Sequence, residues 1–257
     1  MSIQPHIHVA QVAPRVVVCG EPNRANRIAS LLNNAELVAE NREYRLFSGE
    51  FAGQPITVCS TGIGAPSMII AVEELARSGA KAIVRVGSAG AMQSEIGLGE
   101  LILVEGAVRD EGGSKAYIGA VYPAYSSFEL VLEMQRFLAE QSVPTHRGIV
   151  RSHDSFYTDE EAELCRYWHR KGILAADMET SALLTVGRLR GLEVASVLNN
   201  VVLYEQDVQE GVNQYVNADQ RMMQGETLAA RAALHALNAL KFDSPQPIHD
   251  PLHGLTQ

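Results

Sequence analysis

Arginine, serine and carboxylate residues follow several apolar runs of this sequence, where they could bind an anion and a sugar. The first such segment, Gly20-Glu21-Pro22-Asn23-Arg24, comes directly after a β-branched run. A helix that begins there would offer free backbone N–H groups to an anion, with Arg24 in its first turn. Pro22 suits that turn because its missing N–H costs nothing. Such turns are common, so this segment alone favours a tight turn with a solvated arginine.

Arg85 lies inside a second apolar run, between Val84 and Val86, and Ser88 follows it closely. An unpaired buried guanidinium costs several kcal/mol, so Arg85 needs a partner. That partner is either an anion beyond the end of the strand, to which Ser88 would add a donor, or an internal carboxylate. The residues alone favour neither alternative.

Two carboxylates, Asp177 and Glu179, flank Met178 just before an amphipathic helical pattern. Acidic residues in a first turn usually only stabilise the helix dipole. Alternatively, Glu179 accepts hydrogen bonds from sugar hydroxyls, because a carboxylate is purely an acceptor. The combination is more informative than any one segment: arginines and a hydroxyl for a phosphate, carboxylates for a diol, and Phe156-Tyr157 for a base.

The order of apolar runs predicts the scaffold that positions these side chains. Short β-branched runs alternate with helical patterns, which indicates an α/β protein with a mainly parallel or mixed sheet. We expect strands at 15–19, 82–86, 101–104 and 194–203, a hairpin over 46–60, and helices at 23–32, 128–140, 160–170, 180–189 and 217–240, with a further helix through Ile69, Val72 and Leu75. Ligands bind beyond the carboxyl ends of the strands in such sheets. Neither a repeat nor a linker is visible, so we expect one domain over residues 1–242 and a loose tail over 243–257.

Composition excludes several classes of function. The 257 residues are 46% hydrophobic and 20% charged, which suits a protein with a sizeable core. A formal net charge of −9 argues against binding to nucleic acid or to an anionic membrane. The three cysteines have neither disulfide-framework nor zinc-site spacing, so no metal site is expected from them. We find no secretory signal and no apolar run long enough to span a bilayer, and therefore expect a cytoplasmic protein.

These residues together resemble the nucleoside phosphorylase superfamily, which contains uridine phosphorylases and hexameric bacterial-type purine nucleoside phosphorylases. Each motif is weak alone, but the ordered set is specific and extends from about Pro5 to Leu240. The matching segments are residues 20–24, 41–44, 60–67, 73–75, 85–90, 108–112, 155–157 and 177–179. The resemblance implies a single α/β domain with a central mixed, twisted and partly barrel-like sheet flanked by helices.

The resemblance also implies an activity: inorganic phosphate splits a nucleoside into a free base and (deoxy)ribose 1-phosphate, without a cofactor. By position, Gly20, Arg24, Arg85 and Ser88 would bind phosphate, joined by Arg42 from a neighbouring subunit; His6, Asp177, Met178 and Glu179 would bind ribose. Arg85 and Glu179 would be the catalytic residues. Because Arg42 would serve a neighbouring subunit, the resemblance also implies a homo-oligomer, with a dimer as the minimal unit and a hexamer as the expected assembly. A monovalent cation such as K⁺ would sit at the dimer interface, where Glu43, Ile63 and Ser67 match.

The identity of the nucleobase is the part of the substrate that the sequence determines least. The glutamine and arginine that read uracil in enteric uridine phosphorylases correspond to Glu160 and Ala162, and valine stands where purine members carry an aspartate. We favour uridine or a related pyrimidine nucleoside, and expect Phe156, Glu160, Asn200 and Tyr204 to contact the base. The alternatives are a purine nucleoside phosphorylase, a hydrolytic nucleosidase and a non-catalytic nucleoside-binding protein. A dinucleotide-dependent oxidoreductase is disfavoured because G-x-G-x-x-G spacing is missing after the first strand.

Overall fold

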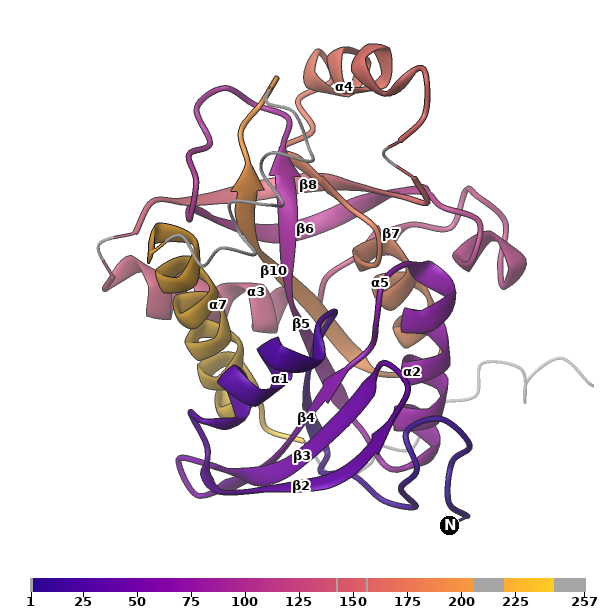
Figure 1. Ribbon diagram of the computed structural model, residues 1–257, viewed down its shortest axis with the longest axis vertical. Coiled ribbons are helices and arrows are strands. Elements are labelled where there is room, and N and C mark those ends of the chain that lie inside the picture. The colour runs from indigo at the N-terminus through magenta and orange to yellow at the C-terminus, as the bar shows by residue number, and fades with distance from the viewer. Residues whose placement is uncertain (1, 142, 156, 206–219, 243–257) are drawn as a thin grey trace, which may run out of the picture.

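The computed structural model describes residues 2–141, 143–155, 157–205 and 220–242 (Figure 1). The helices are α1 (Pro22–Ala29), α2 (Ala65–Arg77), α3 (Phe128–Ala139), α4 (Glu161–His169), α5 (Thr180–Leu189) and α7 (Gln220–Ala239), with a 3₁₀ turn at Ser114–Ala116. The strands are β1 (Arg15–Cys19), β2 (Asn33–Asn41), β3 (Tyr44–Phe51), β4 (Gln54–Ser60), β5 (Ala82–Ala91), β6 (Leu101–Asp110), β7 (Ala124–Tyr125), β8 (Thr145–His153), β9 (Ala175–Asp177) and β10 (Glu193–Val202).

All ten strands belong to one mixed sheet with the order β10-β6-β8-β9-β5-β1-β4-β3-β2, and β7 pairs with β6. An additional pairing between β10 and β5 closes β5, β10, β6, β8 and β9 into a five-stranded barrel. The remaining strands extend from β5 as an open sheet through the parallel pairs β5–β1 and β1–β4. The predicted single α/β domain with a mixed, partly barrel-like sheet is therefore confirmed.

Helices cover the sheet on two sides, as Figure 1 shows: α3 and α7 pack together on one side, and α2 and α5 on the other. β1 and the first half of β5 are buried on both faces, which explains their continuous β-branched runs. Two buried clusters result. One fills the space under α2 and α5, and the other lies under α1, α3 and α7.

Element boundaries agree with the sequence patterns where those patterns are apolar. The hairpin over 46–60, the helix over 180–189 and the strand over 194–203 form within about two residues of the prediction. α1 ends at Ala29, three residues early, and the first residues of the expected helix 217–240 lie outside the described residues. The expected tail, 243–257, also lies outside them.

Four strands were missed: the short β7 and β9, and the longer β2 and β8. Nearly all of β2 is exposed, and the first half of β8 is polar, so neither presents an apolar run. Pairing makes them strands: β2 with β3 in a hairpin, and β8 with β6 over nine residue pairs. Within the described residues, no helix is both long and apolar enough to cross a membrane.

Candidate active site

One cavity of about 1210 Å³ opens where several strands end. Its walls come from the segments after β1, β4, β9 and β10, from the second half of β5, and from α4. Most of the predicted phosphate and ribose positions line it: Gly20, Arg24, Arg85, Ser88, Met178 and Glu179. This arrangement agrees with the expectation from the sequence that a ligand binds beyond the carboxyl ends of the strands.

Arg85 on β5 is the central cation of the cavity, and its side chain is only 3% exposed. Its Nε donates to Asp177 Oδ2 at 3.2 Å, and its Nη2 donates to Glu179 Oε2 at 2.5 Å. Nη1 is buried without a hydrogen-bond partner in the described part of the chain. Arg85 therefore has internal carboxylate partners and keeps one donor group for a ligand.

Gly87 makes room for that guanidinium. Residues two apart on a strand face the same side, so Gly87 lies beneath the Arg85 side chain. A Cβ at position 87 would lie 2.6 Å from Leu198 Cδ2 and 2.7 Å from Arg85 Cζ, both far inside contact distance. Only glycine fits this position with Arg85 where it is.

Asp177, a predicted ribose residue, has a fully enclosed side chain that does not line the cavity. Its Oδ2 accepts from the Thr180 amide and hydroxyl at 3.0 and 2.6 Å, and its Oδ1 accepts from Ser152 Oγ at 2.6 Å. Every oxygen is thus used within the protein. Asp177 positions Arg85 and the start of α5, and its predicted contact with ribose stays a prediction.

Glu179 is the N-cap residue of α5 and lines the cavity beside Met178. Its Oε1 accepts from the Gly64 amide at 2.7 Å. Gly64 has a φ of +91°, a conformation that glycine adopts without strain. Burial raises the pKa of the Glu179 carboxyl above its usual range, and the Arg85 guanidinium opposes this rise. The carboxylate is held by two donors and still has lone pairs for a hydroxyl ligand.

Arg24, in the first turn of α1, is held by a residue from the far end of the chain. Its Nε donates to Glu226 Oε2 on α7 at 2.8 Å, and its Nη1 donates to Val86 O at 3.2 Å. Glu226 also accepts from Arg27 Nε at 2.6 Å and is itself 3% exposed. Sequence reasoning missed Glu226, because a single glutamate on an amphipathic helix carries no local signal of a partner 202 residues away.

His6 and Arg42 lie outside the cavity of their own chain. His6 Nδ1 is 2.7 Å from Glu74 Oε1, and Glu74 also accepts from the backbone amides of His6 and Ile7. Arg42 is exposed at the turn between β2 and β3, with a φ of +54°. Their predicted contribution to a neighbouring subunit's site stays a prediction.

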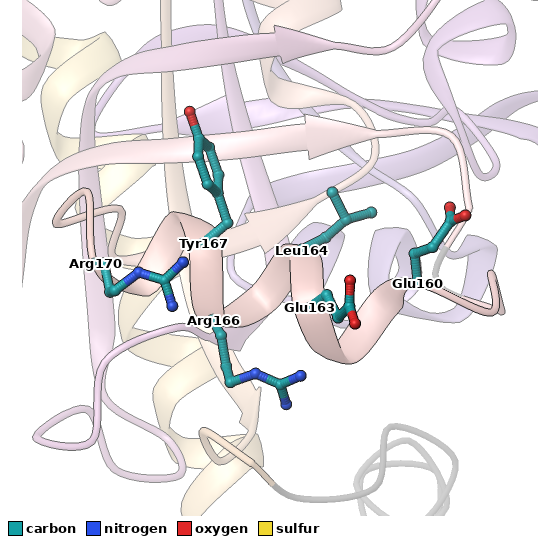
Figure 2. Close-up of a pocket in the computed structure, with 6 residues that line it drawn as sticks. All are labelled: Glu160, Glu163, Leu164, Arg166, Tyr167 and Arg170. Atoms are coloured by element: carbon teal, nitrogen blue, oxygen red, sulfur yellow. The ribbon is translucent and has the colours of Figure 1, made fainter.

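The residues predicted to contact the base lie in different parts of the structure. Tyr204 lines the cavity and stacks on His169, with ring centroids 4.6 Å apart. Glu160 is exposed and belongs to a different depression along α4, shown in Figure 2. Asn200 is fully buried, and its Nδ2 donates to the Ile96 and Gly97 carbonyls. Neither Glu160 nor Asn200 is among the residues that line the cavity, Phe156 lies outside the described residues, and the predicted base contacts stay predictions.

Glu43, Ile63 and Ser67, the positions matched to a cation site, also line the cavity. Ser67 Oγ donates to Glu43 Oε1 at 2.9 Å, and that hydrogen bond lowers the pKa of Glu43, together with a larger contribution from its backbone. The available ligand atoms are oxygens, which suits a hard cation. Among the described residues, no group of three or more His, Cys, Asp or Glu side chains could hold a metal ion.

Residues 14–238 match the phosphorylase superfamily. The chain belongs to this superfamily. The resemblance stated from its motifs is thereby confirmed, and with it the expectation of an enzyme. This superfamily member is 34% identical over 245 residues to a guanosine phosphorylase of Halorubrum lacusprofundi, a match that covers 93% of this chain and all of that protein. It is 38% identical over 198 residues to a uridine phosphorylase of Thermococcus kodakarensis, over 72% of each chain.

Solved structures of superfamily members have the same fold. A uridine phosphorylase from Vibrio fischeri ES114, complexed with 6-hydroxy-1-naphthoic acid, aligns with a TM-score of 0.87 and 67% identity, over 93% of this chain and 97% of that one. A purine nucleoside phosphorylase from Toxoplasma gondii, in complex with immucillin-H, aligns with a TM-score of 0.80 and 27% identity, over 92% and 96%.

Proposed function

We propose that this protein cleaves uridine or a related pyrimidine nucleoside by phosphorolysis, and releases the free base and (deoxy)ribose 1-phosphate. One observation carries the proposal: within one cavity, Arg85 pairs with Glu179 and keeps the buried donor Nη1 for an anion. A cation for phosphate and a carboxylate for ribose hydroxyls thus stand next to each other, as attack of phosphate on C1′ requires.

The phosphate end of the cavity is built from Gly20, Arg24, Arg85 and Ser88. Arginine forks hold a phosphate in one orientation, which the point charge of lysine does less well. As the base departs, the sugar takes on oxocarbenium character. A phosphate dianion fixed beneath C1′ stabilises that positive charge and is already placed to attack it.

The sugar would lie across Met178 and Glu179, because both line the cavity next to Arg85. Glu179 would accept the 2′- and 3′-hydroxyls, since its carboxylate is fixed by Gly64 and Arg85 and cannot rotate away. Tyr204, stacked on His169, also lines the cavity and offers an aromatic side chain against which the base would lie.

Uridine is favoured because uridine phosphorylases recur among the relatives, including the Vibrio fischeri structure at 67% identity. Purine nucleosides form the second candidate class, on account of the guanosine phosphorylase relative and the purine nucleoside phosphorylase structure. A nucleosidase, which uses water, would have no need of Arg24 and Arg85 in one cavity.

The decisive experiment measures release of free base from uridine, thymidine, inosine and adenosine, each with and without inorganic phosphate. We expect uridine cleavage that requires phosphate and yields ribose 1-phosphate. Equal rates in phosphate-free buffer would establish a nucleosidase instead. Binding without any base release after long incubation would establish a nucleoside-binding protein.

The proposal extends to assembly and location. The exposed Arg42 would complete the phosphate site of a neighbouring subunit and His6 its ribose site, so a dimer is the minimal unit and a hexamer its expected assembly. A cation such as K⁺ would bind through Glu43, Ile63 and Ser67 at the dimer interface. The enzyme would act in nucleoside salvage in the cytoplasm. Light scattering after size exclusion tests the assembly, since a monomer with full activity would exclude shared sites.

A further inference from the structure

Arg151 on β8 and Glu161 at the start of α4 are charged side chains beside the cavity that the proposed mechanism does not use. The Arg151 side chain is 4% exposed, and its Nε donates to Asp110 Oδ2 at 2.7 Å. Its Nη1 lies 3.8 Å from Glu161 Oε1, which is beyond hydrogen-bond distance. Both Arg151 Nη1 and Glu161 Oε2 are buried without a hydrogen-bond partner in the part of the chain that the structure describes.

This pair borders the cavity. Glu161 lines it directly, as do Ala162 and Cys165 on the same helix. Arg151 is in register with Ala176 on β9, another lining residue, and partners in register face the same side of a sheet. The next register pair, Ser152 and Asp177, faces the other way, where the two side chains bond to each other. Arg151 therefore lies on the cavity side of β8, although it is not itself a lining residue, and its Nη1 lies 3.8 Å from Glu161, which is one.

Unsatisfied buried donors and acceptors are rare, and each costs free energy until a partner fills it. Here a buried donor on β8 and a buried acceptor on α4 lie close together, and α4 also lines the cavity. An acidic residue in a first helical turn can serve the helix dipole alone. That role, however, requires neither a buried Oε2 atom nor a guanidinium from another element nearby.

We propose that Arg151 and Glu161 recognise the base. The inference rests on the proposed function and names the residues that determine its specificity. The Arg151 guanidinium donates to a ring carbonyl, and the Glu161 carboxylate accepts the adjacent ring N–H. The ligand class is a nucleobase with a C(=O)–N–H edge, such as uracil. Cytosine offers a lone pair where uracil offers N3–H, and a carboxylate rejects it.

The test compares uridine with 3-methyluridine, which lacks the N3–H donor. The readout is the ratio of their kcat/KM values for the full-length enzyme and its variants. Wild type should favour uridine by roughly 10- to 100-fold, the usual size of a hydrogen bond to a charged group. Glu161→Ala should bring the ratio close to one, and Glu161→Gln, which keeps an acceptor oxygen, should restore part of it.

The matched control is Glu163→Ala on the same helix. Glu163 is exposed and lines the separate depression of Figure 2, not the cavity, so the ratio should stay at the wild-type value. Arg151→Lys keeps a positive charge beside Asp110 but loses the guanidinium N–H groups that would reach the base. This variant should have a higher KM for uridine and an unchanged KM for phosphate. A purely structural role would change both KM values together.

A wild-type ratio in Glu161→Ala overturns the inference, as does a wild-type enzyme that does not distinguish the two nucleosides. Calorimetric binding of uracil and 3-methyluracil repeats the comparison without turnover. If wild type fails to cleave uridine yet prefers uracil through Glu161, the proposed function fails and the inference stands. If cleavage occurs and the preference does not depend on Glu161, only the inference fails.

Discussion

The guanidinium of Arg85 and the carboxylate of Glu179 are joined at 2.5 Å, although 94 positions separate them in the chain. β5 supplies the cation, and the junction between β9 and α5 supplies the carboxylate. Because both side chains line the same cavity, a ligand that binds one changes the environment of the other. The first three predictions change this pair or the glycine beneath it, and the last two change ion pairs elsewhere in the fold.

Removing the cation should abolish most activity. Arg85→Ala should lower kcat/KM by about 2–4 kcal/mol of transition-state stabilisation, because phosphate loses a fixed donor. Stability should also fall, since the buried carboxylates of Asp177 and Glu179 lose their cationic partner. Steady-state kinetics on the folded fraction measure the first effect, and thermal unfolding measures the second. Arg85→Lys is the control, because lysine keeps the positive charge but lacks the parallel N–H donors of the guanidinium. An unchanged rate in Arg85→Ala would exclude the assigned role.

Glu179→Gln should affect ribonucleosides more than 2′-deoxyribonucleosides. The amide keeps one acceptor oxygen, but it loses the charge that strengthens hydrogen bonds from the 2′- and 3′-hydroxyls. The measurement is kcat/KM for uridine against 2′-deoxyuridine in both enzymes. Equal losses on the two substrates would remove Glu179 from the 2′-hydroxyl.

Gly87→Ala should disable the enzyme without touching a ligand. The added Cβ would meet Leu198 Cδ2 at 2.6 Å and Arg85 Cζ at 2.7 Å, so Arg85 must move. Overpacking of this kind costs about 1–3 kcal/mol of stability. Gly119→Ala is the matched control, because nothing lies within 4 Å of its added Cβ. Activity in Gly87→Ala equal to that of the control would show that Arg85 need not stay where it is.

Glu226→Gln should raise the KM for phosphate, because the carboxylate orients Arg24 and Arg27 through hydrogen bonds of 2.6–2.9 Å. Removing one partner of a buried ion pair typically costs about 3–5 kcal/mol of stability. The control is Glu133→Gln on α3, whose partner Arg136 is 64% exposed and whose loss should cost little. A phosphate KM that stays constant while stability falls would make Glu226 purely structural.

Glu73 should make stability depend on pH. Its carboxylate accepts from Arg190 Nη2 at 2.6 Å, and these hydrogen bonds lower the pKa of Glu73 below its ordinary value of 4.5, against the opposing effect of burial. A lowered folded-state pKa stabilises the protein above pH 4.5, and this contribution is lost as the pH falls through the folded-state value. Glu73→Gln should cost roughly 1 kcal/mol in urea unfolding at pH 7, and progressively less below pH 4.5. A difference that is constant with pH would contradict the assignment.

Sequence patterns predicted the parts of the site that follow apolar runs. Gly20 and Ser88 could be placed because each closely follows an apolar run, and Glu179 because it precedes an amphipathic helix. Asp177 and Asn200 were assigned to ligands by their positions in the family resemblance, which say nothing of how a side chain is paired. In the structure, their partners are Ser152 and Thr180 in one case, and the backbone carbonyls of Ile96 and Gly97 in the other.

The sequence by itself determined the α/β class, the family, and the segments that line the cavity, because apolar periodicity and glycine after a strand are local properties of the chain. Only the tertiary structure decided which charges are paired. Arg24 with Glu226, Arg85 with Glu179, and Arg151 beside Glu161 all join separate elements. The free energy of a buried charge depends on what the fold brings within about 4 Å of it, and spacing along the chain does not encode that distance.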